Sequence, residues 1–238
     1  MRATRRLVFA LALTLLANAC PAWGRVCDSA QDYFPALEVS GSYYEIGHKV
    51  GSTFRDRIQR ASRLYEGLFK FVDEDGDKNL QACVRITTEH FPEIIEELRG
   101  IADGAQMPFE RIFAMNMRAE VEALRAHAKE GNPGCSTIHL ISGDNKYLLQ
   151  NEDASSPYVG NMYVVKATTP KGITFVGLCY PGIALANGPA ITSAGIMQTN
   201  NSISGYRYKK GTVHADIHPK AQRDKRWPRR SSISGPGQ

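Results

Sequence analysis

The sequence has few cysteines, and no two of them have the CxxC spacing of a zinc site. The five cysteines are Cys20, Cys27, Cys83, Cys135 and Cys179. An acidic run at residues 73–77 also lacks the alternating oxygen ligands and the glutamate at position twelve that a calcium-binding loop needs. We therefore expect a solvated loop at residues 73–77, no metal site and no cofactor.

The chain also lacks an apolar run long enough to span a membrane comfortably. A basic segment and a short apolar run fill residues 1–16, and Ala17-Asn18-Ala19 has the small-x-small form of a signal-peptidase site. We predict a signal peptide over residues 1–24 and a secreted or periplasmic protein. Lipid anchoring at Cys20 is disfavoured, because Ala17 stands where such sites usually carry leucine.

The formal net charge of +5 is confined to one end of the chain. Residues 207–230 carry nine Lys or Arg against two Asp, a net charge of +7, which leaves −2 elsewhere, or −5 without the three arginines of the signal peptide. An acidic body argues against a nucleic-acid-binding module. Residues 207–238 show no apolar period, so we expect a basic, disordered tail.

The first half of the chain has a helical pattern. A short strand is predicted at residues 34–41, and Ser42 with Glu45 has the capping-box form that begins a helix. Apolar residues then recur at spacings of three and four. Gly47 and Gly51 lie one turn apart and would allow close helix packing. Further helices are predicted over residues 80–90, 92–104 and 108–124.

After residue 134 the pattern changes to short β-like runs. Strands are predicted over residues 135–141, 146–150, 162–167, 173–178 and 190–198. Because the turns between them are short, we expect antiparallel neighbours in one meander. The first strand of this meander begins at Cys135.

Cys135 follows a loop of charges, glycines and Pro133, which is typical of an exposed turn. If the bond between Gly134 and Cys135 were cut, Cys135 would carry a thiol and a free α-amino group. That amine has an ordinary pKa of about 7.7 to 8.0 and can take the thiol proton. The alternative is a buried structural cysteine. A dyad with His139 is not expected, because His139 lies about 13 Å further along the strand.

Polar clusters follow two of the predicted strands. They are Asn151-Glu152-Asp153 and Asn200-Asn201. An asparagine amide can donate a hydrogen bond to the negative charge that develops on a carbonyl oxygen, whereas strand-ending turns explain the same residues without chemistry. Arg118 and Glu120 interrupt an apolar helical pattern and form either an ordinary polar face or a group that points toward Cys135.

Taken in order, these segments resemble the acyl-coenzyme A:6-aminopenicillanic acid acyltransferase (isopenicillin N acyltransferase) family of N-terminal nucleophile hydrolases. The matching segments are Tyr44-Glu45-Ile46-Gly47, residues 97–104 with Pro108-Phe109, Asn116-x-Arg118-x-Glu120, Gly134-Cys135-Ser136, Asn151-Glu152-Asp153, Tyr180-Pro181-Gly182, Ser193-Ala194-Gly195 and Asn200-Asn201. Their common order is more specific than any one of them.

The resemblance implies an α+β fold of the αββα sandwich type that cleaves itself between Gly134 and Cys135. Residues 25–134 would then be a helical propeptide or α chain, and residues 135–206 the start of a β chain that remains its partner. The activity implied is that of an amidase or acyltransferase, which attacks linear amide bonds of small amide or acyl substrates through a thioester on Cys135.

Site residues are assigned by matching the family motifs. Asn201 matches the donor to the oxyanion, with Asn200 as the alternative, and Asp153 matches the carboxylate that orients the new amino terminus. Asn151 and Arg118 match supporting polar residues.

The end of the chain departs from the family pattern. Family members continue well beyond the position of Asn201, whereas the residues after about 205 lead here into the basic tail. We expect a C-terminal part that is truncated or read in a shifted frame. The alternative to an enzyme is an inactive remnant or a binding protein that keeps the scaffold uncut.

Overall fold

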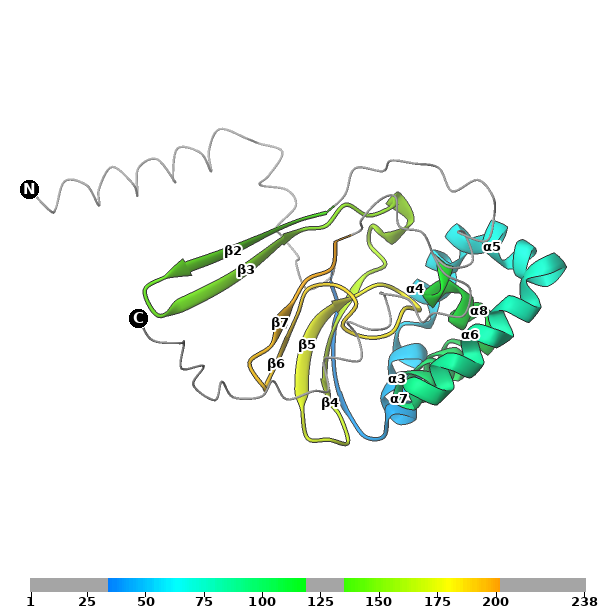
Figure 1. The fold of residues 1–238 in the computed structure, drawn as a ribbon, viewed down its shortest axis with the longest axis horizontal. Coiled ribbons are helices and arrows are strands. Elements are labelled where there is room, and N and C mark those ends of the chain that lie inside the picture. The colour runs from blue at the N-terminus through cyan, green and yellow to red at the C-terminus, as the bar shows by residue number, and fades with distance from the viewer. Residues whose placement is uncertain (1–33, 119–134, 202–238) are drawn as a thin grey trace, which may run out of the picture.

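The fold is α+β, with helices packed on one face of a five-stranded sheet and a separate hairpin extending from its other side (Figure 1). This computed structural model describes residues 34–118 and 135–201. The predicted signal peptide, Glu120, Gly134 and the predicted basic tail lie outside the described residues.

The helices occupy the first described segment. They are α3 (Tyr43–Thr53), α4 (Arg55–Ser62), α5 (Glu66–Phe71), α6 (Asp77–His90), α7 (Pro92–Ala105) and α8 (Phe109–Asn116), with the short helical turns η1 (Arg63–Tyr65), η2 (Val72–Gly76) and η3 (Ser156–Tyr158). The predicted capping box is confirmed at α3. Ser42 Oγ accepts from the Glu45 backbone N–H at 3.2 Å, and Glu45 Oε2 accepts from the Ser42 backbone N–H at 2.8 Å.

The prediction of a loop at residues 73–77 is wrong, because η2 and the start of α6 make this segment helical. Leu68 and Val72 on one side and Leu80 on the other are buried in the core, so continuous helical turns are needed to bury them all. Asp73 and Glu74 are exposed as predicted.

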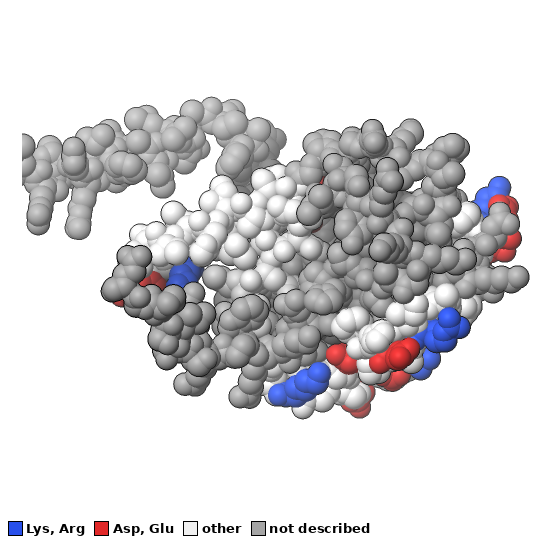
Figure 2. Space-filling view, in the orientation of Figure 1, with Lys and Arg blue, Asp and Glu red and all other residues white. Residues whose placement is uncertain are grey.

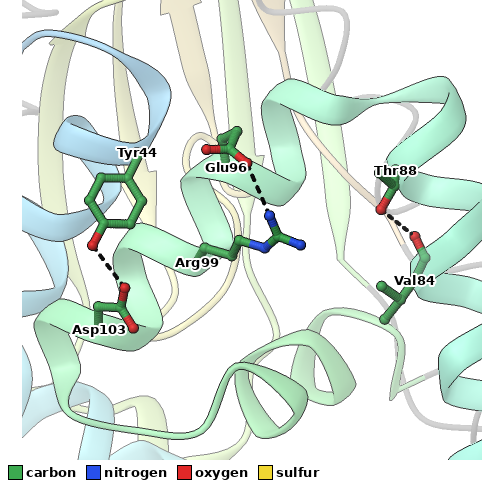
Figure 3. A network of polar contacts seen from close by, with 6 residues as sticks. All are labelled: Tyr44, Val84, Thr88, Glu96, Arg99 and Asp103. Carbon is green, nitrogen blue, oxygen red and sulfur yellow. Dashed lines mark hydrogen bonds and ion pairs between the residues drawn. The ribbon is translucent and has the colours of Figure 1, made fainter.

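Helices α3 and α7 approach closely because glycines face each other where they cross. A methyl group built on Gly47 would overlap the backbone carbonyl of Glu97, and one built on Gly100 would overlap that of Tyr44. The predicted close packing at Gly47 is thus confirmed. Tyr44 also bridges the two helices, since its hydroxyl donates to Asp103 Oδ2 at 2.8 Å (Figure 3), and this hydrogen bond raises the pKa of Tyr44.

We expect Gly100→Ala to lower the free energy of unfolding by about 2 kcal/mol or more, because the new methyl group must push backbone away from backbone. Gly67→Ala is the matched control. A methyl group there meets nothing within 4 Å, so this change should raise the free energy of unfolding by about 0.5 to 1 kcal/mol. Urea denaturation of both variants measures the difference. Equal stability of the two variants would refute the packing argument.

The strands form two sheets, so the predicted single meander is wrong. They are β1 (Ala36–Ser40), β2 (Ser136–Ser142), β3 (Asn145–Asn151), β4 (Tyr163–Thr168), β5 (Thr174–Cys179), β6 (Ala190–Thr192) and β7 (Met197–Gln198). The larger sheet has the order β1-β4-β5-β6-β7, with β1 parallel to β4 and the other neighbours antiparallel, and β2 pairs only with β3. Residues 152–162 separate β3 from β4 with a connection that is no tight turn, so nothing local makes these strands neighbours.

The last predicted strand, residues 190–198, is also divided. Gly195 has a φ of +80°, and its backbone N–H donates to the Thr192 carbonyl at 3.0 Å. This turn separates β6 from β7 and lets them pair with each other. The positive φ explains why glycine occupies the turn.

The hairpin of β2 and β3 presents an apolar face. Ile138 pairs with Leu149 and Leu140 pairs with Tyr147, and the four side chains are between 48% and 62% exposed. Figure 2 shows the hairpin surface as uncharged except near its tip, whereas charges of both signs gather over the helices. The hairpin therefore exposes apolar side chains that a globular protein usually covers.

Two buried polar side chains hold the connection between β5 and β6. Asn116 Nδ2 donates to the Gly182 carbonyl at 3.0 Å, and its Oδ1 accepts from the Ala184 backbone N–H at 2.8 Å. Glu97 Oε1 accepts from the Leu185 backbone N–H at 2.8 Å. Because a broken bond would leave buried polar groups unpaired, this connection is firmly positioned. It begins at Tyr180, which faces the candidate site.

Candidate active site

Cys135 lies immediately before β2 and is half-buried. The pairing of Ser136 with Asn151 brings the end of β3 beside it. As a result, the Asp153 backbone N–H donates to Cys135 Sγ at 3.4 Å, and Sγ lies 4.0 Å from the Asp153 carbonyl oxygen. The backbone of Asp153 therefore contacts the sulfur, while its side chain is exposed.

Asn201 lies on the same face of β2 as Cys135. Its Oδ1 lies 3.0 Å from Thr137 Oγ1, whose single hydrogen has a nearer acceptor in Gln150 Oε1 at 2.6 Å. Thr137 is two residues beyond Cys135, hence on the same side of the strand and roughly 7 Å along it. Asn200 contributes only its backbone carbonyl, which accepts from Gln150 Nε2 at 3.1 Å. Of the two asparagines, Asn201 is thus the one whose side chain contacts Thr137 and Gln150.

The amide nitrogen of Asn201 points away from these contacts. Gln150 Nε2 donates to Asn201 Oδ1 at 3.1 Å, so the oxygen of this side chain faces both Gln150 and Thr137. Within residues 34–118 and 135–201, Asn201 Nδ2 has no hydrogen-bond partner.

Glu152 and Tyr180 close the other side of the site. Tyr180 Oη donates to Glu152 Oε1 in a short hydrogen bond, and Glu152 Oε2 accepts from Gln150 Nε2 at 3.1 Å. Burial raises the pKa of Tyr180 well above the usual range, with further contributions from the hydrogen bond and charge of Glu152 and from nearby Cys135. Tyr180 therefore remains a protonated donor at neutral pH.

We expect the buried tyrosines to ionise only when the protein unfolds in alkali. Burial also raises the pKa of Tyr163. A raised pKa favours the neutral form in the folded state, so the associated stability is present below the ordinary tyrosine range and is lost as the pH rises through the folded pKa. Alkaline titration of phenolate absorbance should show a late step that coincides with unfolding and is smaller in Tyr180→Phe. An identical late step in the variant would contradict this expectation.

Two predicted supporting residues lie outside this hydrogen-bond network. Asn151 is exposed at the end of β3, and Arg118 is exposed just beyond α8. In the described part of the chain, no hydrogen bond joins the Asn151 side chain to Cys135. Gly134 lies outside the described residues, so the bond proposed for cleavage stays a prediction.

Sequence reasoning missed several residues of the site. They are Thr137, Gln150, Tyr180 and Thr199, whose hydroxyl lies 2.9 Å from Thr137 Oγ1. The strand period alone places Thr137 on the face of Cys135. Gln150 follows from the hairpin register, because it pairs with Thr137. Nothing local indicates Thr199. Tyr180 belongs to the matching segment Tyr180-Pro181-Gly182, but that motif assigns it no site role.

Two further properties bear on the kind of site. In residues 34–118 and 135–201 no cluster of His, Cys, Asp and Glu has a geometry able to hold a metal ion. Among the helices of the same segments, none combines the length and the apolar character needed to cross a membrane.

Comparisons with known proteins identify relatives. The chain is 26% identical over 195 residues to the beta-alanyl-dopamine/carcinine hydrolase of Drosophila melanogaster, covering 74% of this chain and 50% of that protein. It is 25% identical over 161 residues to the acyl-coenzyme A:6-aminopenicillanic-acid-acyltransferase 40 kDa form of Emericella nidulans, covering 66% of this chain and 41% of that protein. No family model matches the chain. The chain spans about half the length or less of these curated relatives.

Both relatives are N-terminal nucleophile hydrolases, and the likeness at 25% and 26% identity supports the resemblance that the motifs predict. The second relative carries the name of the family that the motifs predict. The relatives are a hydrolase and an acyltransferase, which supports enzymatic activity of one of these two kinds.

Proposed function

We propose that this protein is a self-processing cysteine amidase or acyltransferase that acts on linear amide bonds through an acyl-thioester on Cys135. The observation that carries the proposal is the position of Cys135. Its sulfur lies at the first residue before β2, and an amide donor from Asn201 lies on the same face of that strand.

The first step of the proposal is self-cleavage. Cys135 Sγ attacks the carbonyl carbon of Gly134, the carbon–nitrogen bond breaks, and the nitrogen becomes the free α-amine of Cys135. Water then hydrolyses the thioester, which releases the carboxylate of Gly134 and restores the thiol. The products are a helical chain and a chain that begins with the nucleophile.

The second step acts on substrate. The α-amine takes the thiol proton, Sγ attacks the amide carbon, and the Asn201 amide donates to the oxyanion. The leaving amine departs with the proton, and water or an amine acceptor resolves the thioester. In this scheme the Asp153 carboxylate orients the α-amine, and Asn151 and Arg118 have supporting roles. The names of the relatives favour small linear amides as the substrate class.

The proposal extends to the fold and the compartment. Helices already cover one face of the larger sheet, and Val176 and Ile191 are exposed on its other face. An αββα sandwich would cover that face with a second sheet, to which the hairpin of β2 and β3 would belong. The pattern of residues 1–24 supports export to the periplasm or outside the cell.

Intact-mass measurement of the purified full-length chain tests the proposal. We expect two fragments, the second beginning at Cys135, and hydrolysis of small linear amides by the cleaved protein. A second candidate is a binding protein that keeps the scaffold uncut, which the exposed apolar face of the hairpin favours. An undivided chain without amidase activity would support that candidate and overturn the proposal.

A further inference from the structure

We propose that Glu152, acting through Gln150, determines which end of the Asn201 amide faces the reacting carbonyl. Both are positioning residues, since the side-chain hydrogen bonds of both lead to other residues than Cys135. The inference rests on the proposed function, because it assigns a role within the same site. It concerns Gln150 and Glu152, to which the family motifs assign no role.

The donor and acceptor directions of this hydrogen-bond network are set first by Glu152. A carboxylate has acceptors and no hydrogen to donate. One of its oxygens accepts from Tyr180 Oη, and the other accepts from Gln150 Nε2 at 3.1 Å. Tyr180 lies at the start of the connection that Asn116 and Glu97 hold, and burial keeps it protonated. The end of the Gln150 amide that faces Glu152 must therefore be its nitrogen, which can donate to the carboxylate.

The orientation of the Gln150 amide in turn determines which end of the Asn201 amide faces it. Its nitrogen carries two hydrogens and lies 3.1 Å from each of three acceptors, which share them, and its Oε1 accepts from Thr137 Oγ1 at 2.6 Å. The three acceptors are Glu152 Oε2, the Asn200 carbonyl and Asn201 Oδ1. All four contacts agree with one orientation of the Gln150 amide. Because the Gln150 nitrogen is a donor, the end of the Asn201 amide that faces it must be the acceptor oxygen, Oδ1.

The consequence concerns the free end of Asn201. The two ends of an amide side chain have nearly the same shape, so hydrogen-bond polarity decides which end points where. With Oδ1 engaged, Nδ2 is directed away from Gln150 and can donate to an oxyanion. The reversed amide would present an oxygen to a developing negative charge, which repels it. The network thus prepares a donor before substrate arrives.

Gln150→Glu tests the inference most directly, because the introduced carboxylate can only accept and should turn Asn201 Nδ2 toward itself. Hydrolysis of a small linear amide by the cleaved full-length protein should lose on the order of 100-fold in kcat, with KM unchanged. Alkylation of Cys135 by iodoacetamide should keep its rate. Glu152→Gln, which can accept or donate, should lose on the order of 10-fold.

Gln106→Glu is the matched control. It makes the same change of charge at an exposed residue that follows α7, and kcat should stay unchanged. Retention of wild-type kcat in Gln150→Glu would overturn the inference while leaving the proposed function intact, because the wild-type protein would still cleave itself and the probe.

A second measurement does not depend on activity. A hydrogen-resolving neutron structure of the full-length protein should show Asn201 Nδ2 directed away from Gln150, and directed toward residue 150 in Gln150→Glu. The opposite orientation in the wild-type protein would overturn the inference even in an active enzyme. Conversely, an inactive, uncut wild-type protein with the expected orientation would refute the proposed function and support the polarity argument.

Discussion

Replacing Cys135 with alanine should leave the protein as one undivided chain, whereas the wild-type protein should separate into two fragments. The variant removes the only atom that can attack the Gly134 carbonyl and form the thioester in the proposed scheme. Amide hydrolysis should fall to the background rate as well. Intact-mass measurement and a hydrolysis assay on the same preparations check both results.

Cys83→Ala is the control for this prediction. Cys83 is a free, partly buried cysteine in α6, and burial raises the pKa of its thiol. A thiol with a raised pKa forms little thiolate and is a poor nucleophile, so the variant should be cleaved as the wild type is. If Cys135→Ala were cleaved and active, another residue would have to be the nucleophile.

Replacing Asn201 with alanine should reduce kcat by roughly 100- to 1000-fold, the usual cost of losing one oxyanion donor. The alkylation rate of Cys135 should change little, because the contacts of the Asn201 side chain are with Thr137 and Gln150. Comparison of kcat, KM and alkylation for the same variant separates a lost donor from a disturbed nucleophile.

Asn200→Ala provides the comparison that decides between the two asparagines. Asn200 uses its backbone carbonyl in the network, and alanine retains that carbonyl. We therefore expect a much smaller loss of kcat than in Asn201→Ala. A larger loss in Asn200→Ala would show that the motif match is displaced by one residue and that Asn200 is the donor.

Predictions that depend on neighbouring residues were confirmed. The capping box at Ser42 and Glu45 begins α3, and Gly47 lies against α7 where the packing is close. The hairpin of β2 and β3 has the predicted antiparallel pairing, with Gly143 at a φ of +59° in its turn. These features depend on side-chain period, capping and turn preference, all of which act over a few residues.

Predictions that needed long-range information were wrong or incomplete. The prediction of a single meander was wrong, because the partners of a strand depend on which distant segments it meets, as in the parallel pairing of β1 with β4. The prediction of a loop at residues 73–77 was wrong, because burial of Leu68, Val72 and Leu80 outweighs the preference of a charged, glycine-containing run for a loop.

The amino-acid sequence by itself indicated a resemblance to one family, the α+β class and the position of Cys135 at the start of the strand half, because each depends on motifs and periods along the chain. Only the tertiary structure decided how Thr137, Gln150, Glu152, Tyr180 and Asn201 meet beside that cysteine. The physical reason is that hydrogen-bond polarity at the site depends on groups from three separate segments, and no local pattern records which donor will face which acceptor.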